Sequence, residues 1–127
     1  MLASGGYFVE PTVFRQVPHN ARIAQEEIFG PVLAVIPFDR EDDAIRLANS
    51  TMYGLSAYVW TANLSTGMKV AKAIRSTVLV NATAPAGEGA GHAASWEPFG
   101  LSGLGPEGGV AGMESYLRRQ LICFSHA

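Results

Sequence analysis

Apolar residues recur along the chain with two different spacings, and these spacings predict which segments form strands and which form helices. Residues 31–38 are almost continuously apolar, as in a strand that is covered on both faces. Two shorter runs, Ser56–Trp60 and Thr77–Asn81, predict further strands. Near the start, Tyr7–Phe14 holds β-type residues that are split by Pro11, which indicates an edge strand or a bend.

Helices are predicted between these strands. Asp39 opens an acidic stretch and is the expected N-cap of a helix that ends near Asn49. A second helix is expected from about Asn63, because apolar residues recur there at the spacing of one buried face: Leu64, Met68, Ala71 and Ile74. The order strand–helix–strand–helix–strand is typical of crossovers that build a parallel sheet, so the predicted fold class is α/β.

The pattern changes over residues 82–109, where Gly, Pro and Ala dominate. A loop of this length in a compact domain is usually functional, and we call it the rim loop. A short helix is expected over 111–119, followed by an apolar terminal strand within 120–125. No linker divides the sequence, so we expect a single domain over 1–127.

Composition excludes several functional classes. The chain of 127 residues is 48% hydrophobic and 16% charged, which suits a globular domain with a core. Its net charge of −2 offers no basic patch, so neither nucleic acid nor a membrane surface is an expected partner. Cys123 is the one cysteine, so neither an intrachain disulfide nor a Cys-rich metal site is expected. The start shows no signal peptide, and a cytoplasmic setting is the default expectation.

The segment Gln25–Val32 carries the most specific motif. It reads Q-E-E-I-F-G-P-V and resembles the E-E-x-F-G-P-V segment of the NAD(P)-dependent aldehyde dehydrogenase superfamily. The resemblance implies the C-terminal part of the catalytic domain together with the terminal oligomerisation strand. Further matching segments follow in order and spacing over nearly the whole chain: Gly6–Thr12, Ala48–Asn49, Tyr53–Ala57, Val59–Thr61, Val80–Asn81, Pro98–Gly100 and Ser102–Gly103.

This resemblance implies a cofactor contact at Glu27 and Phe29. Enzymes of the family oxidise an aldehyde to a carboxylic acid through a thioester and pass a hydride to NAD or NADP. In the family, the second Glu of the motif contacts the nicotinamide ribose and the Phe packs against the nicotinamide. A carboxylate accepts hydrogen bonds from vicinal hydroxyls, and an aromatic ring limits the positions of a planar group. From the residues alone, a solvated acidic pair and a core Phe are the alternatives, and Glu26 is expected to be structural.

Candidates on the substrate side lie further along the chain. Asn81 ends a predicted strand, where α/β folds place ligands, and in the family this Asn lies close to the active centre. The alternative is an Asn that bonds nearby backbone. Trp96 and Phe99 are bulky residues of the rim loop that could contact a hydrophobic substrate, although Trp96 could equally anchor the loop. His92 is expected to be an exposed residue without a chemical role.

The family's nucleophilic Cys in a Gly-Gln-x-Cys setting, its general-base Glu and its coenzyme domain are not among these 127 residues. No catalytic residue is therefore assigned, and neither NAD nor NADP is expected to bind tightly to this chain alone. Cys123 has apolar neighbours and is expected to be a small buried residue. The segment Pro98–Gly103 is shorter than the usual P-F-G-G-x-K-x-S-G and lacks its Lys, which puts the family's substrate preferences in doubt.

Three functions follow as hypotheses. The first is the C-terminal portion of an aldehyde dehydrogenase that is inactive alone. The second is a non-catalytic module for oligomerisation or interaction, since residues 121–124 offer an apolar edge for strand addition. The third, a minimal enzyme that uses Cys123, has the least support. The expected partners are another copy of the chain or the missing aldehyde dehydrogenase portion.

Overall fold

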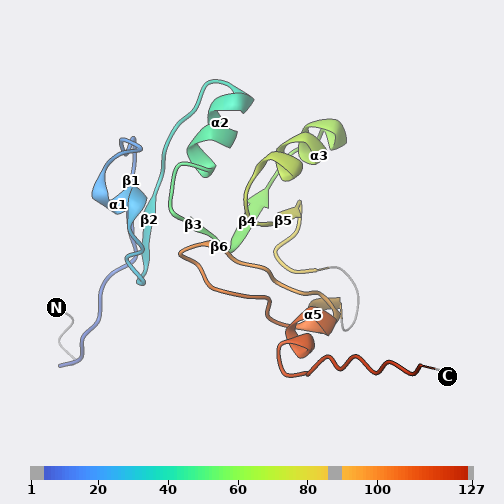
Figure 1. The fold of residues 1–127 in the computed structure, drawn as a ribbon. Helices are drawn as coiled ribbons and strands as arrows, with labels where there is room; N and C mark the ends of the chain where they lie inside the picture. The colour runs from blue at the N-terminus through green and yellow to red at the C-terminus, as the bar shows by residue number, and fades with distance from the viewer. Residues whose placement is uncertain (1–4, 86–89, 126–127) are drawn as a thin grey trace. The chain divides into compact units, whose positions relative to one another are not determined.

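The computed structural model describes residues 5–85 and 90–125, and the chain divides into two compact units (Figure 1). Unit 1 is Met1–Met52 and unit 2 is Tyr53–Ala127. Each unit contains a pair of parallel strands, so the predicted α/β class with parallel strands is confirmed. The single domain over 1–127 stays a prediction.

Unit 1 is built on the parallel pair β1 (Thr12–Phe14) and β2 (Val32–Ala34). Beyond β1 the pairing continues, because the N–H of Val17 donates to the carbonyl oxygen of Val35 at 3.1 Å, and Val17 is buried. The short helix α1 (Arg22–Gln25) connects the two strands and was not predicted. The expectation that residues 31–38 are covered on both faces is wrong for the described chain. Leu33 is 58% exposed, because no covering layer meets its side of the strand.

The helix α2 (Glu41–Ala48) follows β2, and its C-cap is Asn49, where the helix was predicted to end. Its N-cap is Arg40, whose side chain makes no capping hydrogen bond, so the prediction of Asp39 as the cap is wrong. The first turn instead carries Glu41, Asp42 and Asp43. Negative charge near the N-terminal N–H groups stabilises a helix without a capping side chain. This explains why the helix begins one residue later than predicted.

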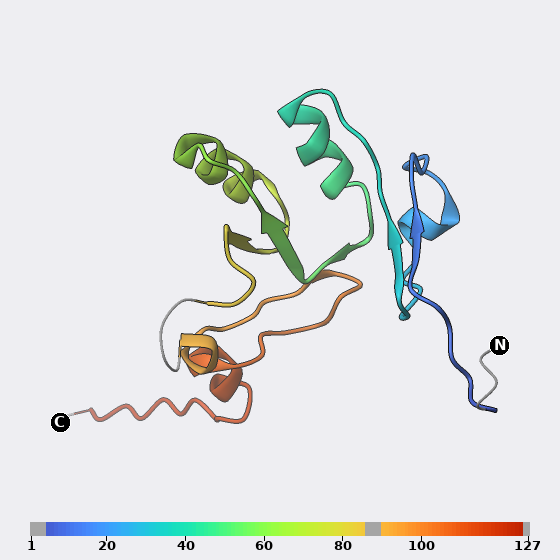
Figure 2. The ribbon, with the colours of Figure 1, turned by 180° about the vertical axis from the view of Figure 1, so that it is seen from behind.

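Unit 2 is built on the parallel strands β4 (Ser56–Val59) and β5 (Thr77–Val80), which α3 (Leu64–Ala73) connects. Seen from either side, α3 lies alongside this strand pair (Figures 1 and 2). Asn63 caps the helix, since its side-chain oxygen accepts from the N–H of Thr66 at 3.1 Å. The core consists of Val70 from the helix and Leu79 from β5.

The buried face of α3 differs from the predicted one. Leu64 is 76% exposed and Met68 is 49% exposed, whereas Gly67 and Val70 are buried. At Gly67 an added Cβ would lie 3.0 Å from a side-chain carbon of Val80, so the missing side chain lets the helix approach β5 closely. The buried face of α3 therefore carries Gly67 and Val70, and the predicted face at Leu64 and Met68 is wrong. Ala71 and Ile74 are half-buried, in line with the prediction.

The rim loop contains regular structure. Its β6 (Phe99–Gly100) pairs antiparallel with β3 (Tyr53–Gly54), and it also holds the short helix α4 (Ala90–Ala93). Contacts join α4 to α5 (Gly109–Glu114), which is shorter than the helix predicted over 111–119. Residues 117–125 follow without an assigned strand pairing, and the terminal strand over 120–125 stays a prediction. No helix in the described part of the chain is long and apolar enough to cross a membrane.

Candidate functional site

Phe29 has an unusual backbone conformation in unit 1. Its φ of 54° lies in the left-handed region, and its side chain is 91% exposed. The following residues are fixed by backbone hydrogen bonds, since Val32 donates to Gly30 at 2.7 Å and Thr12 donates to Pro31 at 2.9 Å. A left-handed conformation costs a non-glycine residue on the order of 1–3 kcal/mol and tends to mark functional sites. The structure therefore presents the ring of Phe29 to solvent, at the end of a tethered turn.

The two acidic residues before Phe29 differ in their contacts. The carboxylate of Glu26 accepts from the Arg22 guanidinium at 2.7 Å, one helical turn away, which supports the structural role expected for Glu26. Glu27 is exposed. The alternative that Phe29 is a core residue is not what the structure shows, because its side chain is exposed.

Asn81 lies at the end of β5 in unit 2, with φ of 52°. Its side-chain Nδ2 donates to the carbonyl oxygen of Thr61 at 2.8 Å, and its Oδ1 accepts from the N–H of Thr61 at 2.9 Å. Its own backbone N–H donates to Val59 at 2.8 Å. The amide thus continues the strand pairing where the backbone turns away. These bonds support the backbone-binding alternative, while the substrate-side role of Asn81 stays a prediction.

Trp96 and Phe99 lie in a loop that is closed at its base. The backbones of Trp96 and Glu107 exchange two hydrogen bonds, of 2.7 and 2.8 Å. This supports an anchoring role for Trp96, whose side chain is half-buried. Phe99 is 45% exposed in β6. A further tie joins the loop to β3, because Ser102 Oγ accepts from the N–H of Gly54 at 2.9 Å.

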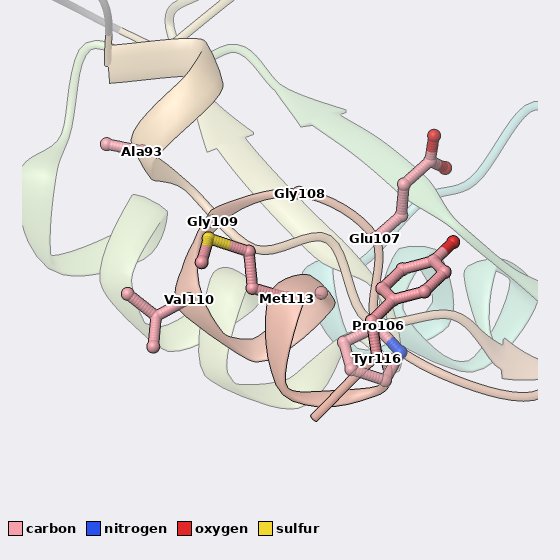
Figure 3. A pocket seen from close by; sticks show the side chains of 9 residues that line it. Ala93, Pro106, Glu107, Gly108, Gly109, Val110, Met113 and Tyr116 are labelled. Atoms are coloured by element: carbon pink, nitrogen blue, oxygen red, sulfur yellow. The ribbon is translucent and has the colours of Figure 1, made fainter. Parts of the chain in front are cut away.

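An open hollow of about 560 Å³ lies beside α4 and α5, and the sequence analysis did not anticipate it (Figure 3). Its described lining residues are mainly apolar, and among them Glu107 is the one that is charged. Val110, Met113 and Tyr116 recur every third residue, and this spacing was the signal in the sequence. The remaining lining residues are Ala93, Pro106, Gly108, Gly109 and Gly112.

The predicted site residues fall into both units. Glu27 and Phe29 belong to unit 1, whereas Asn81, Trp96 and Phe99 belong to unit 2. The prediction that Cys123 is buried is wrong: the thiol is free and exposed, because the segment that carries it extends beyond α5 without packing. Residues 5–85 and 90–125 contain no His, Cys, Asp or Glu cluster able to hold a metal ion. The His92 side chain and residues 86–89 of the rim loop lie outside what the structure describes.

Comparison with known proteins places the whole chain in one family. Residues 2–122 match the aldehyde dehydrogenase family. An aldehyde dehydrogenase of Enchytraeus buchholzi is 45% identical over 95% of the chain. The 3,6-anhydro-alpha-L-galactose dehydrogenase of Streptomyces coelicolor is 43% identical over 98% of it. The chain spans 24% of the length of each of these relatives, so it corresponds to about a quarter of such an enzyme.

Solved structures show the same relationship. An indole-3-acetaldehyde dehydrogenase of P. syringae, solved in complex with NAD+ and IAA, superposes with a TM-score of 0.81 at 45% identity. The match covers 91% of this chain and 23% of that one. A Mycobacterium tuberculosis aldehyde dehydrogenase complexed with NAD+ gives a TM-score of 0.79 at 42% identity, over 87% of this chain and 22% of that one.

Proposed function

The chain belongs to the aldehyde dehydrogenase family, and from that membership we propose that it forms the nicotinamide-side and rim portion of an enzyme that oxidises an aldehyde to a carboxylic acid. The observation that carries the proposal is Phe29, an exposed aromatic ring on a left-handed residue within the family's own motif. Strain at an exposed position serves no packing purpose within this chain, and strained residues cluster at ligand sites.

Glu27 and Phe29 fit a nicotinamide ribonucleotide by their chemistry. The carboxylate of Glu27 is exposed and can accept two hydrogen bonds from the vicinal hydroxyls of a ribose. The exposed ring of Phe29 offers a flat apolar wall that restricts how a planar ring lies. When bound, NAD or NADP supplies the hydride acceptor. Solved relatives hold NAD+, which supports this assignment.

We expect the chain to be inactive by itself. The sequence has no Gly-Gln-x-Cys segment to supply a nucleophile. The chain alone also buries little apolar surface. In its described part the buried apolar residues are Val17, Val70 and Leu79, and none of these is fully enclosed. Many large apolar side chains are exposed, which favours a missing covering portion. The proposed partner is therefore the rest of an aldehyde dehydrogenase, and the lone thiol favours a cytoplasmic setting. A tagged chain that accumulates outside the cytoplasm would contradict that setting.

A segment replacement tests this function. In the Enchytraeus buchholzi relative, the matching quarter is replaced by residues 1–127, and aldehyde-dependent NAD(P)H formation is measured. The replaced enzyme is expected to turn over, and Glu27→Gln and Phe29→Ala are each expected to raise the KM for the cofactor about ten-fold, the equivalent of one charged or well-packed contact. Glu10→Gln and Tyr7→Ala are matched controls, because both side chains are exposed in the same unit. Equal effects in test and control variants would reject the assignment.

The second candidate function is an interaction module. It is favoured by the segment after α5, where Leu121, Ile122 and Phe124 are exposed close together. Apolar side chains that gather on an extended segment suit addition to the edge of a sheet. The two functions are compatible within one enzyme, and they differ in what the isolated chain does: the module associates with itself, whereas the enzyme portion needs a different partner.

A further inference from the structure

A side chain from the rim loop completes a strand pairing that is too short to hold by itself. β3 and β6 have two residues each. Such a pairing is far below the size that is stable alone. The N–H of Gly54 in β3 donates to Ser102 Oγ at 2.9 Å, across 48 positions of sequence, and this contact is part-buried. Ser102 thus adds a hydrogen bond to β3 beyond the end of β6.

The turn that carries Ser102 is closed on itself. The N–H of Ser102 donates to the carbonyl oxygen of Phe99 at 3.2 Å. At Gly103 an added Cβ would lie 2.8 Å from the ring of Pro98, so the two ends of the turn touch. The hydroxyl of Ser102 is consequently fixed relative to Phe99. A hydrogen bond that fixes Ser102 therefore also fixes the position of Phe99.

The receiving strand is fixed as well. At Gly54 an added Cβ would overlap the carbonyl oxygen of Arg75 and lie 2.9 Å from the Cβ of Phe99. The backbone of β3 is therefore enclosed between the end of α3 and the rim loop. A glycine here permits the close approach, and the Ser102 hydroxyl accepts a hydrogen bond from its N–H.

We propose that Ser102 is a positioning residue that locks the rim loop onto Gly54 and thereby sets the place of Phe99 on the substrate side. The structural half of the proposal stands on the contacts of unit 2. The consequence for substrate rests on the proposed function. Within that function, the ring of Phe99 contacts a bulky aldehyde but not a small one, and this contact weakens when the backbone of Phe99 is free to move.

Hydrogen exchange at Gly54 tests the structural half in the full chain. Ser102→Ala is expected to speed exchange of the Gly54 N–H about five- to ten-fold, the effect of losing one ordinary hydrogen bond. Two other N–H groups serve as references and are expected to be unchanged: that of Thr77, which donates to Leu55 just before β4, and that of Asn81, which donates to Val59 in β4. Ser102→Thr retains a hydroxyl and is expected to keep the protection, and Ser65→Ala, at an exposed position of α3, is the control.

Unchanged exchange of Gly54 in Ser102→Ala would overturn the proposal. Loss of protection at Thr77 and Asn81 as well would also overturn it, because the hydroxyl would then support the whole unit and not the rim loop. If Ser102→Thr lost protection of Gly54 with the references intact, the hydroxyl would not be the tie.

The substrate half is tested in the segment-replacement enzyme. Ser102→Ala is expected to raise the KM for a bulky aldehyde such as benzaldehyde about five-fold, leaving the KM for acetaldehyde and the kcat for both unchanged. Ser102→Thr retains the hydroxyl and is expected to keep the original KM for benzaldehyde. Equal changes for both aldehydes would contradict selection by Phe99. A replacement enzyme without any turnover would reject the proposed function, and the exchange data would still decide the role of Ser102.

Discussion

The side-chain amide of Asn81 brackets the backbone of Thr61, donating to its carbonyl oxygen at 2.8 Å and accepting from its N–H at 2.9 Å. One side chain thereby takes the place of the next residue in a parallel strand pairing. The chain leaves β5 at this point in a left-handed conformation and enters the rim loop. The amide therefore fixes the position from which the rim loop departs.

Replacing Asn81 is expected to cost stability through two separable effects. Asn81→Ala loses both bonds to Thr61 and keeps the backbone strain, so the free energy of unfolding is expected to fall by about 2–3 kcal/mol. Asn81→Gly loses the bonds and relieves the strain, so a smaller loss of about 1 kcal/mol is expected. Urea unfolding of the two variants and of Asn20→Ala, an exposed control, provides the comparison. Equal losses for Ala and Gly would show that the left-handed backbone carries no strain.

Phe29→Gly is expected to separate a binding role from a packing role. The exposed ring contributes little packing, and glycine adopts φ of 54° without strain. The free energy of unfolding should therefore stay the same or rise by up to about 1 kcal/mol. In the segment-replacement enzyme the same change should raise the KM for NAD(P). A loss of more than about 1 kcal/mol in the isolated chain would show that the ring packs within this chain after all.

Two glycines of unit 2 are expected to respond oppositely to alanine. Gly54→Ala places a methyl group against Arg75 and Phe99, where backbone would have to move, so a loss of about 2–4 kcal/mol or failure to fold is expected. At Gly105 an added Cβ meets nothing within 4 Å, and Gly105→Ala should be neutral or stabilise by about 0.5 kcal/mol. Thermal melting of both variants checks this. A tolerated Gly54→Ala would contradict the close approach of β3 to the end of α3.

The interaction-module function predicts self-association at tens of micromolar, with the segment after α5 as its main contact. Ile122→Asp should shift the chain toward monomer in analytical ultracentrifugation, because a carboxylate at an apolar contact costs several kcal/mol to bury. Leu104→Asp is the control, since Leu104 is also an exposed apolar residue but lies in the rim loop. If both variants lowered the mass equally, the association would arise from exposed apolar surface in general, and the module hypothesis would lose its support.

The sequence predicted those elements whose signal is local. The runs that became β4 and β5, and the helices α2 and α3, follow from spacing within a few residues, whereas α1 did not. The face of α3 was predicted wrongly, because its packing depends on Gly67 meeting Val80, a pairing that periodicity does not encode. The left-handed conformations of Phe29 and Asn81 were not predicted, because neither residue is a glycine.

Long-range contacts explain the other differences. The bonds from Asn81 to Thr61 join residues 20 positions apart, and the bond from Gly54 to Ser102 spans 48. Neither contact follows from a pattern along the chain. The same holds for Cys123, whose neighbours suggested burial, because burial requires a covering partner that the described residues do not supply. The motif at Glu27 and Phe29 predicted the candidate site, and the geometry added the exposure that makes it available.

The most direct test of the central claim is aldehyde-dependent NAD(P) reduction by the purified 127-residue chain, measured together with Cys123→Ala and with the segment-replacement enzyme as positive control. We expect no turnover in either form of the isolated chain and turnover in the replacement enzyme, since the chain would then supply cofactor and rim contacts but no nucleophile. Turnover by the isolated chain that disappears in Cys123→Ala would contradict this and make the exposed thiol the nucleophile of a minimal enzyme.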